Sequence, residues 1–219
     1  DGKRFAWACP TGIKTRDASG AGNESDALLS KTDMSPNHWT PDGRTLLFTA
    51  ASSGRDKSDV IWALDLTTGT TTELFRSDAG YTRHAQVSPD GRWIAFTSLQ
   101  NSRPEVFVMD YPGLKSRWQV STQGGIAPRW RGDGDEILFL DLDTRMVSVK
   151  VTATESAVTL GLPSVLFSTE MGYHVLNRVA SWDVDAKGER FFMLEPVQQA
   201  EERPPLTLVR GWSPPTKRN

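Results

Sequence analysis

One sequence pattern, centred on a tight turn, recurs along the chain and constrains its fold more than any other feature. The clearest copy spans residues 87–98, with Pro89, Asp90 and Gly91 at the turn. Pro89 presets φ for the first corner, Asp90 can hydrogen-bond to its own backbone, and Gly91 accepts a positive φ. After the turn, residues 93–98 alternate between two faces with the period of a β-strand. The pattern therefore predicts a strand, a tight turn and a second strand.

The pattern repeats at intervals of similar length. Its turn glycines are Gly2, Gly43, Gly91, Gly134 and Gly188, which lie 41, 48, 43 and 54 residues apart. A period of about 40–50 residues with several short strands per unit is typical of a β-propeller. Each unit is then a blade, a four-stranded antiparallel sheet that packs against its neighbours to bury its faces. We expect an all-β propeller with about five blades represented.

The repeats also predict the blade boundaries. The expected propeller domain is 1–212, with a partial first blade at 1–31, later blades at about 36–76, 84–123, 126–168 and 178–212, and a disordered tail at 213–219. The strand expected before the first turn is absent, and the last blade is incomplete. Two arrangements remain open: a six-bladed ring with blades missing upstream, or a smaller ring closed by pairing the partial blades.

Composition excludes several classes of partner. Hydrophobic residues make up 37% of the chain and charged residues 24%, as in globular proteins. The formal net charge of −2 gives no electrostatic case for nucleic acid or for an anionic membrane surface. No apolar run of about 18 residues occurs, so we expect no membrane insertion in this region. The single cysteine, Cys9, leaves the redox compartment open.

Several stretches resemble the PD-type, WD-repeat-like units of TolB-like β-propellers. Over nearly the whole chain they look like the C-terminal propeller of bacterial, especially acidobacterial, serine/threonine protein kinases. The stretches that carry this resemblance are residues 17–22, 48–62, 88–96, 118–125, 128–131 and 206–212. In such proteins a cytoplasmic kinase domain precedes a membrane helix, and the propeller follows outside the cytoplasm. The resemblance therefore implies a periplasmic location, which composition alone does not decide.

The resemblance implies a sensing or protein-interaction module rather than an enzyme. No kinase motif occurs in this chain. Similar propellers also precede serine peptidase domains and follow DNA-binding winged-helix domains. A propeller that gates a peptidase and the effector domain of a transcriptional regulator are therefore the alternatives.

Catalytic, metal and cofactor motifs are missing from the sequence. No Gly-x-Ser-x-Gly elbow occurs, and His38, His84 and His174 show no metal-ligand spacing. We expect His38 and His84 to be repeat-derived positions at the channel rim, with a metal or catalytic role as the alternative. The tripeptide at 131–133 spells an integrin-type Arg-Gly-Asp, but its place in the repeat makes it a degenerate turn.

The expected geometry of the propeller predicts one candidate binding site, at the mouth of the central channel. In a propeller the first strand of each blade lines the central channel, so polar residues before successive turns converge at its mouth. The candidates are His38, Arg83, His84, Arg129 and Arg178. Such a mouth would hold a protein or peptide segment, or a small anion. The alternative is that these residues serve hydrogen bonds between blades.

The tryptophans near the first strands have two interpretations. Trp39, Trp130 and Trp182 lie in or near the first strands of their units. We expect them in the core between blades, and a stacking wall for a ligand is the alternative.

Overall fold

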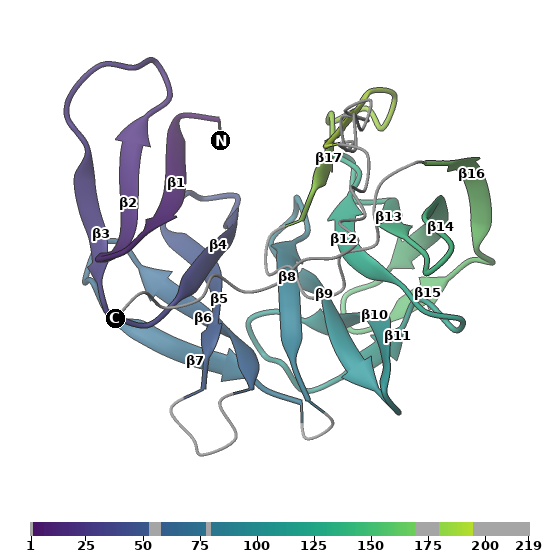
Figure 1. Cartoon of the computed structure of the whole chain (residues 1–219). Helices are drawn as coiled ribbons and strands as arrows, with labels where there is room; N and C mark the ends of the chain where they lie inside the picture. Colours follow the sequence, from purple (N-terminus) through teal and green to yellow (C-terminus); the bar gives the residue numbers. More distant parts are fainter. Residues whose placement is uncertain (1, 53–57, 78–79, 170–179, 195–219) are drawn as a thin grey trace, which may run out of the picture.

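Antiparallel sheets follow one another in chain order around a centre (Figure 1). The computed structural model describes residues 2–52, 58–77, 80–169 and 180–194. Every regular element in these ranges is a strand, and no helix there is long and apolar enough to cross a membrane. The predicted all-β architecture of four-stranded antiparallel blades is confirmed.

The first three sheets keep strict chain order. The first is three-stranded and consists of β1 (Arg4–Cys9), β2 (Gly12–Asp17) and β3 (Ser25–Leu29). The second consists of β4 (Met34–Trp39), β5 (Thr45–Ala51), β6 (Asp59–Asp65) and β7 (Thr71–Phe75). The third consists of β8 (Thr82–Val87), β9 (Trp93–Gln100), β10 (Arg103–Asp110) and β11 (Arg117–Gln119). In Figure 1, β4 and β8 lie near the centre and β3 lies outside.

The fourth sheet divides its outer position between two strands. It consists of β12 (Ile126–Trp130), β13 (Glu136–Leu140), β14 (Arg145–Ala153), β15 (Val158–Leu160) and β16 (Ser164–Ser168). Both outer strands pair with β14, β15 along residues 151–153 and β16 along residues 145–148. Both outer strands lie within the range 126–168 that the sequence predicts for this blade.

A two-stranded hairpin completes the described part. It consists of β17 (Trp182–Val184) and β18 (Phe191–Met193), joined by the turn at Gly188. In Figure 1, β17 and β1 stand on either side of an open gap. The part of the predicted last blade after residue 194, the predicted tail at 213–219, and the residues His174 and Arg178 lie outside the described residues.

In the second and third sheets the aspartate of the turn organises the hairpin around it. In the third sheet the Ser88 hydroxyl donates to Asp90 Oδ1 at 2.5 Å and accepts from the Trp93 amide at 3.0 Å. Thr40 and Asp42 repeat this arrangement in the second sheet, with a hydroxyl-to-carboxylate distance of 2.6 Å. These side chains satisfy the backbone groups that a tight turn leaves unpaired, as the sequence repeat predicts.

The cores lie between successive sheets. The central strands β5 and β9 are buried on both faces, whereas the outer strands β3 and β16 are mostly exposed. Trp130 packs in a cluster shared by the third and fourth sheets, and Trp182 packs between the fourth sheet and the hairpin. Trp39 is half-buried, with the Arg4 guanidinium 4.4 Å from its ring centroid. Trp130 and Trp182 therefore occupy the predicted core positions.

Replacing the turn glycine with alanine should destabilise the fold by a backbone effect alone. Gly91 has a φ of +76°, and a Cβ added there would meet no atom within 4 Å. We expect Gly91→Ala to lower the free energy of unfolding by about 1 kcal/mol. Gly91→Asn is the control and should lose less, because asparagine tolerates positive φ better. Urea denaturation measures both, and equal losses would contradict this explanation.

Candidate functional site

One position on the innermost strands connects successive sheets from the second sheet onward. It lies five residues before the turn glycine and is occupied by His38, Gln86, Arg129 and Asp183. These residues belong to β4, β8, β12 and β17. We call this set the inner row.

The first two members of the inner row accept hydrogen bonds from the following sheet. His38 Nδ1 accepts from the Val87 amide at 3.3 Å, and Gln86 Oε1 accepts from the Trp130 amide at 2.5 Å. The Trp130 indole Nε1–H also donates to the carbonyl oxygen of Gln86 at 3.2 Å. Val87 and Trp130 both lie four residues before their turn glycines, so the two junctions repeat the same contact.

His38 is held in its neutral form. Burial, and secondarily the positive charge of Arg129, lowers the pKa of His38 to about 3. A neutral imidazole that accepts at Nδ1 carries its proton on Nε2, so we assign that tautomer from the hydrogen bond. The inner row therefore brings His38 within the electrostatic influence of Arg129.

Arg129 is the exception in the inner row, because a guanidinium cannot accept a hydrogen bond. At this junction Asp183 Oδ1 accepts both from Arg129 Nε at 3.2 Å and from the Val184 amide at 2.9 Å. Arg129 Nη1 donates to the Pro128 carbonyl at 2.9 Å. The guanidinium lies 5.7 Å from the centroid of the Trp182 ring. Asp183 thus accepts the amide hydrogen bond within its own strand, and Arg129 joins the fourth sheet to the hairpin by donating to Asp183.

The Arg129 side chain is buried, with only 13% of its surface exposed, whereas that of Asp183 is 69% exposed. Burial lowers the pKa of Arg129, and the opposing effects of Asp183 do not cancel this shift. A buried cation with an exposed counter-ion is incompletely compensated.

A cavity of about 360 Å³ opens beside Arg129. It is lined by Arg129, by residues 180–183 and by residues 192–194. Its apolar wall includes Phe192 and Leu194, which are 69% and 75% exposed. The indole Nε1 of Trp182, another lining residue, is buried and has no hydrogen-bond partner among the described residues. We call this space the Arg129 cavity.

Arg83 is bound at the start of β8 by an acidic residue of the preceding sheet. Its Nη2 and Nε lie 2.5 and 2.7 Å from Asp59 Oδ2, and its guanidinium lies 4.2 Å from the Tyr81 ring centroid. Both Arg83 and Asp59 are buried. Arg83 therefore takes part in a bond between sheets.

His84 lies at an irregularity in the innermost strand. Its φ is +57°, and the β8–β9 register shifts between Arg83 and Gln86. His84 Nδ1 lies 3.2 Å from Thr97 Oγ1, which also accepts from the Ala127 amide of the next sheet at 2.9 Å. Ala127 occupies the equivalent position in β12 and has a φ of +53°. His84 thus forms part of a bulge that joins two sheets.

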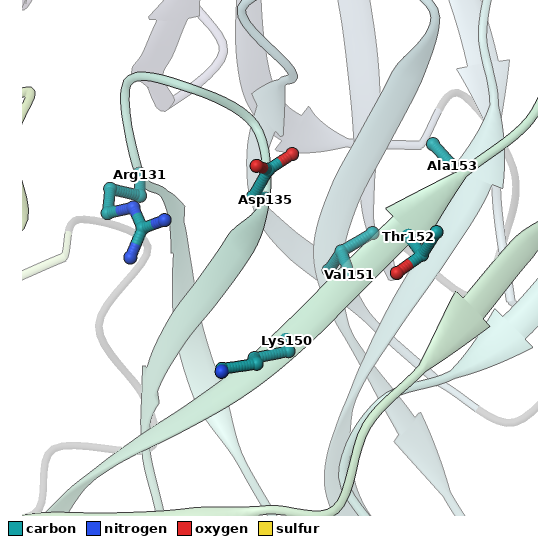
Figure 2. Close-up of a pocket in the computed structure, with 6 residues that line it drawn as sticks. All are labelled: Arg131, Asp135, Lys150, Val151, Thr152 and Ala153. Atoms are coloured by element: carbon teal, nitrogen blue, oxygen red, sulfur yellow. The ribbon is translucent and has the colours of Figure 1, made fainter.

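A second cavity of about 370 Å³ lies at the turn of the fourth sheet (Figure 2). Arg131 and Lys150 extend into the same space, and the Asp135 carboxylate points away from the Lys150 ammonium. Arg131 is bound by Asp133 at 2.7 Å and by Glu136 at 2.7 Å. The two charged ends of the Arg-Gly-Asp tripeptide therefore bind each other, which fits its interpretation as a turn. Lys150 is exposed, unlike Arg129.

Among the residues that the structure describes, no group of three or more His, Cys, Asp or Glu side chains could hold a metal ion.

Comparison with known proteins supports the same fold. No family model matches the sequence. An uncharacterized protein of Agrobacterium fabrum strain C58 is 29% identical over 118 residues, which is 53% of this chain and 39% of that protein. The Tol-Pal system protein TolB of Anaeromyxobacter sp. strain K is 31% identical over 119 residues, which is 54% of this chain and 26% of that protein. The chain thus spans less than half the length of these curated relatives.

A solved structure extends the likeness to most of the described chain. The crystal structure of TolB from Acinetobacter baumannii superimposes with a TM-score of 0.63 at 20% identity, covering 90% of this chain and 48% of that one. The chain therefore has a TolB-like β-propeller fold.

Sequence reasoning missed two members of the inner row, Gln86 and Asp183. The signal was available, because both lie five residues before a turn glycine, as His38 and Arg129 do. Grouping residues by charge rather than by distance from the turn placed Arg83 and His84 with Arg129 instead.

Replacing one partner of the buried Arg83–Asp59 ion pair should lower the free energy of unfolding more than replacing both partners does. We expect Arg83→Met to lower the free energy of unfolding by about 3 kcal/mol, because it leaves the buried Asp59 carboxylate without its cation. Adding Asp59→Asn to this variant should restore part of the loss. Urea denaturation of the single and double variants gives the coupling energy, and strictly additive losses would show that the pair is uncoupled.

Stability should fall between pH 7 and pH 5 because of His38. The unfolded chain binds a proton near pH 6.5, whereas folded His38 resists protonation down to about pH 3. Folding stability is therefore fully present above pH 6.5 and declines as the pH falls, by about 2 kcal/mol at pH 5. His38→Gln can keep the acceptor, as Gln86 does, and should remove this part of the decline. An unchanged pH dependence in His38→Gln would contradict the assignment.

Proposed function

We propose that this chain is a non-catalytic module that binds a protein or peptide segment at the Arg129 cavity, at the mouth of the propeller channel. The observation that carries the proposal is the incompletely compensated guanidinium of Arg129 beside an open, partly apolar cavity. Binding sites combine apolar walls with a few fixed polar groups, and arginine is enriched at protein interfaces. The TolB-like fold is consistent with an interaction module.

We further propose that the module serves a membrane-tethered bacterial serine/threonine kinase as an extracytoplasmic sensor. The support is the likeness of stretches such as 88–96 and 118–125 to the propellers of those kinases. The complete reading frame of the gene tests whether a kinase carries this module. Kinase motifs and a membrane helix upstream are expected, whereas a hydrolase domain downstream or a DNA-binding domain upstream would favour the peptidase or regulator alternative.

Peptide selection tests the binding site. A random peptide display library is selected against the 219-residue chain, and the enriched peptides are titrated against variants. We expect Arg129→Gln to weaken binding about tenfold, because it removes the cation from the cavity. Lys150→Gln is the matched control, since it removes an exposed cation from the other cavity, and should bind as the wild type does.

Two results would contradict the proposal. One is failure to enrich any peptide that binds the wild-type chain. The other is enrichment of peptides that bind Arg129→Gln and the wild type equally. Thermal unfolding of Arg129→Gln shows whether the variant remains folded.

A further inference from the structure

The chemistry of the Arg129 cavity restricts what it can hold, and the argument rests on the function proposed above. At the inner-row position the fold needs an acceptor for an amide of the next sheet, which His38 and Gln86 provide. Arg129 cannot provide one, and Asp183 takes over that hydrogen bond. The connection between the fourth sheet and the hairpin therefore uses the Nε–H of Arg129 on Asp183 and leaves most N–H groups of the guanidinium unexplained.

Arg129 keeps donor capacity toward the cavity. A guanidinium carries five N–H donors, and the hydrogen bonds observed in the described part of the chain use only Nε and Nη1. The planar fork of a guanidinium matches the two oxygens of a carboxylate.

The charge around the cavity argues against a ligand with more than one negative charge. Arg129 is the one cation among the described residues that line it, and Asp183 already contributes one negative charge there. His38 is neutral near pH 7, so it supplies no second cation. A phosphate group, with a charge between about −1.5 and −2, would be poorly balanced in this setting.

We infer that the Arg129 cavity binds a monocarboxylate that carries an apolar group, with the carboxylate on Arg129 and the apolar group against Phe192 and Leu194. The two sources of this chemistry are the C-terminal end of a protein chain whose last residue is apolar, and a free organic acid. The cavity volume of about 360 Å³ lies in the range of small-ligand sites.

Asp183 acts as a built-in competitor for this ligand. Its carboxylate holds Arg129 Nε at 3.2 Å, yet the side chain is 69% exposed and can be displaced. Removing its charge while keeping its acceptor oxygen should therefore strengthen carboxylate binding. Damage to the fold would weaken binding instead, so the direction of this effect separates the two explanations.

Titration calorimetry on the 219-residue chain tests the inference with matched probes. The small probes are hydrocinnamate and its amide, and the peptide probes are one leucine-ended sequence with a free or an amidated C-terminus. We expect the carboxylate forms to bind at least tenfold more tightly than the amides. Arg129→Gln should lose this preference, Asp183→Asn should gain about threefold or more in carboxylate affinity, and Lys150→Gln should change nothing.

Each outcome has a distinct meaning. Tight binding of hydrocinnamate identifies a free acid, whereas binding of the leucine-ended peptide alone identifies a chain terminus. Equal affinity for acids and amides, or weaker carboxylate binding by Asp183→Asn, overturns the inference. Peptides that depend on Arg129 but ignore amidation would leave the proposed function standing. Absence of binding by every acid and every selected peptide would contradict both.

Discussion

The hydrogen bond from the inner row to the next sheet is the contact on which the arrangement of the sheets depends. A blade cannot bury both of its faces alone, so each sheet needs a fixed position against its neighbour. Apolar packing supplies most of the burial but little direction, because it is not directional. The hydrogen bonds that the Val87 amide donates to His38 and the Trp130 amide donates to Gln86 supply that direction at successive junctions. They also satisfy backbone donors that would otherwise lie unpaired in the interior.

Much of the fold could be predicted from the sequence, because the turn carries its own local chemistry. Asp90 and Gly91 specify the hairpin without help from distant residues, so their spacing gave the architecture. The site was harder to predict, because it depends on contacts between sheets. Arg83 looks like a channel residue until folding brings Asp59, 24 residues earlier, against it. The division of the outer strand into β15 and β16 likewise depends on pairing with β14.

Arg129 lies at the junction where we propose that a structural position has become a binding position. The inner row accommodates an arginine there, and the Val184 amide finds its acceptor in Asp183 of its own strand. The arginine is then free to face a cavity, at the expense of burying a cation. Local rules of consistency are expected to fail at functional sites, and this junction is where the repeat departs from its own pattern.

Hydrogen exchange at two amides tests this account most directly. The account predicts that the amides of Val87 and Trp130 are protected, that His38→Ala selectively speeds exchange at Val87, and that Gln86→Ala selectively speeds exchange at Trp130. The amides of the central strand β9 serve as the reference for global opening. Exchange of Val87 and Trp130 at the rate of exposed amides, or equal acceleration throughout the sheets in both variants, would contradict the central role given to the inner row.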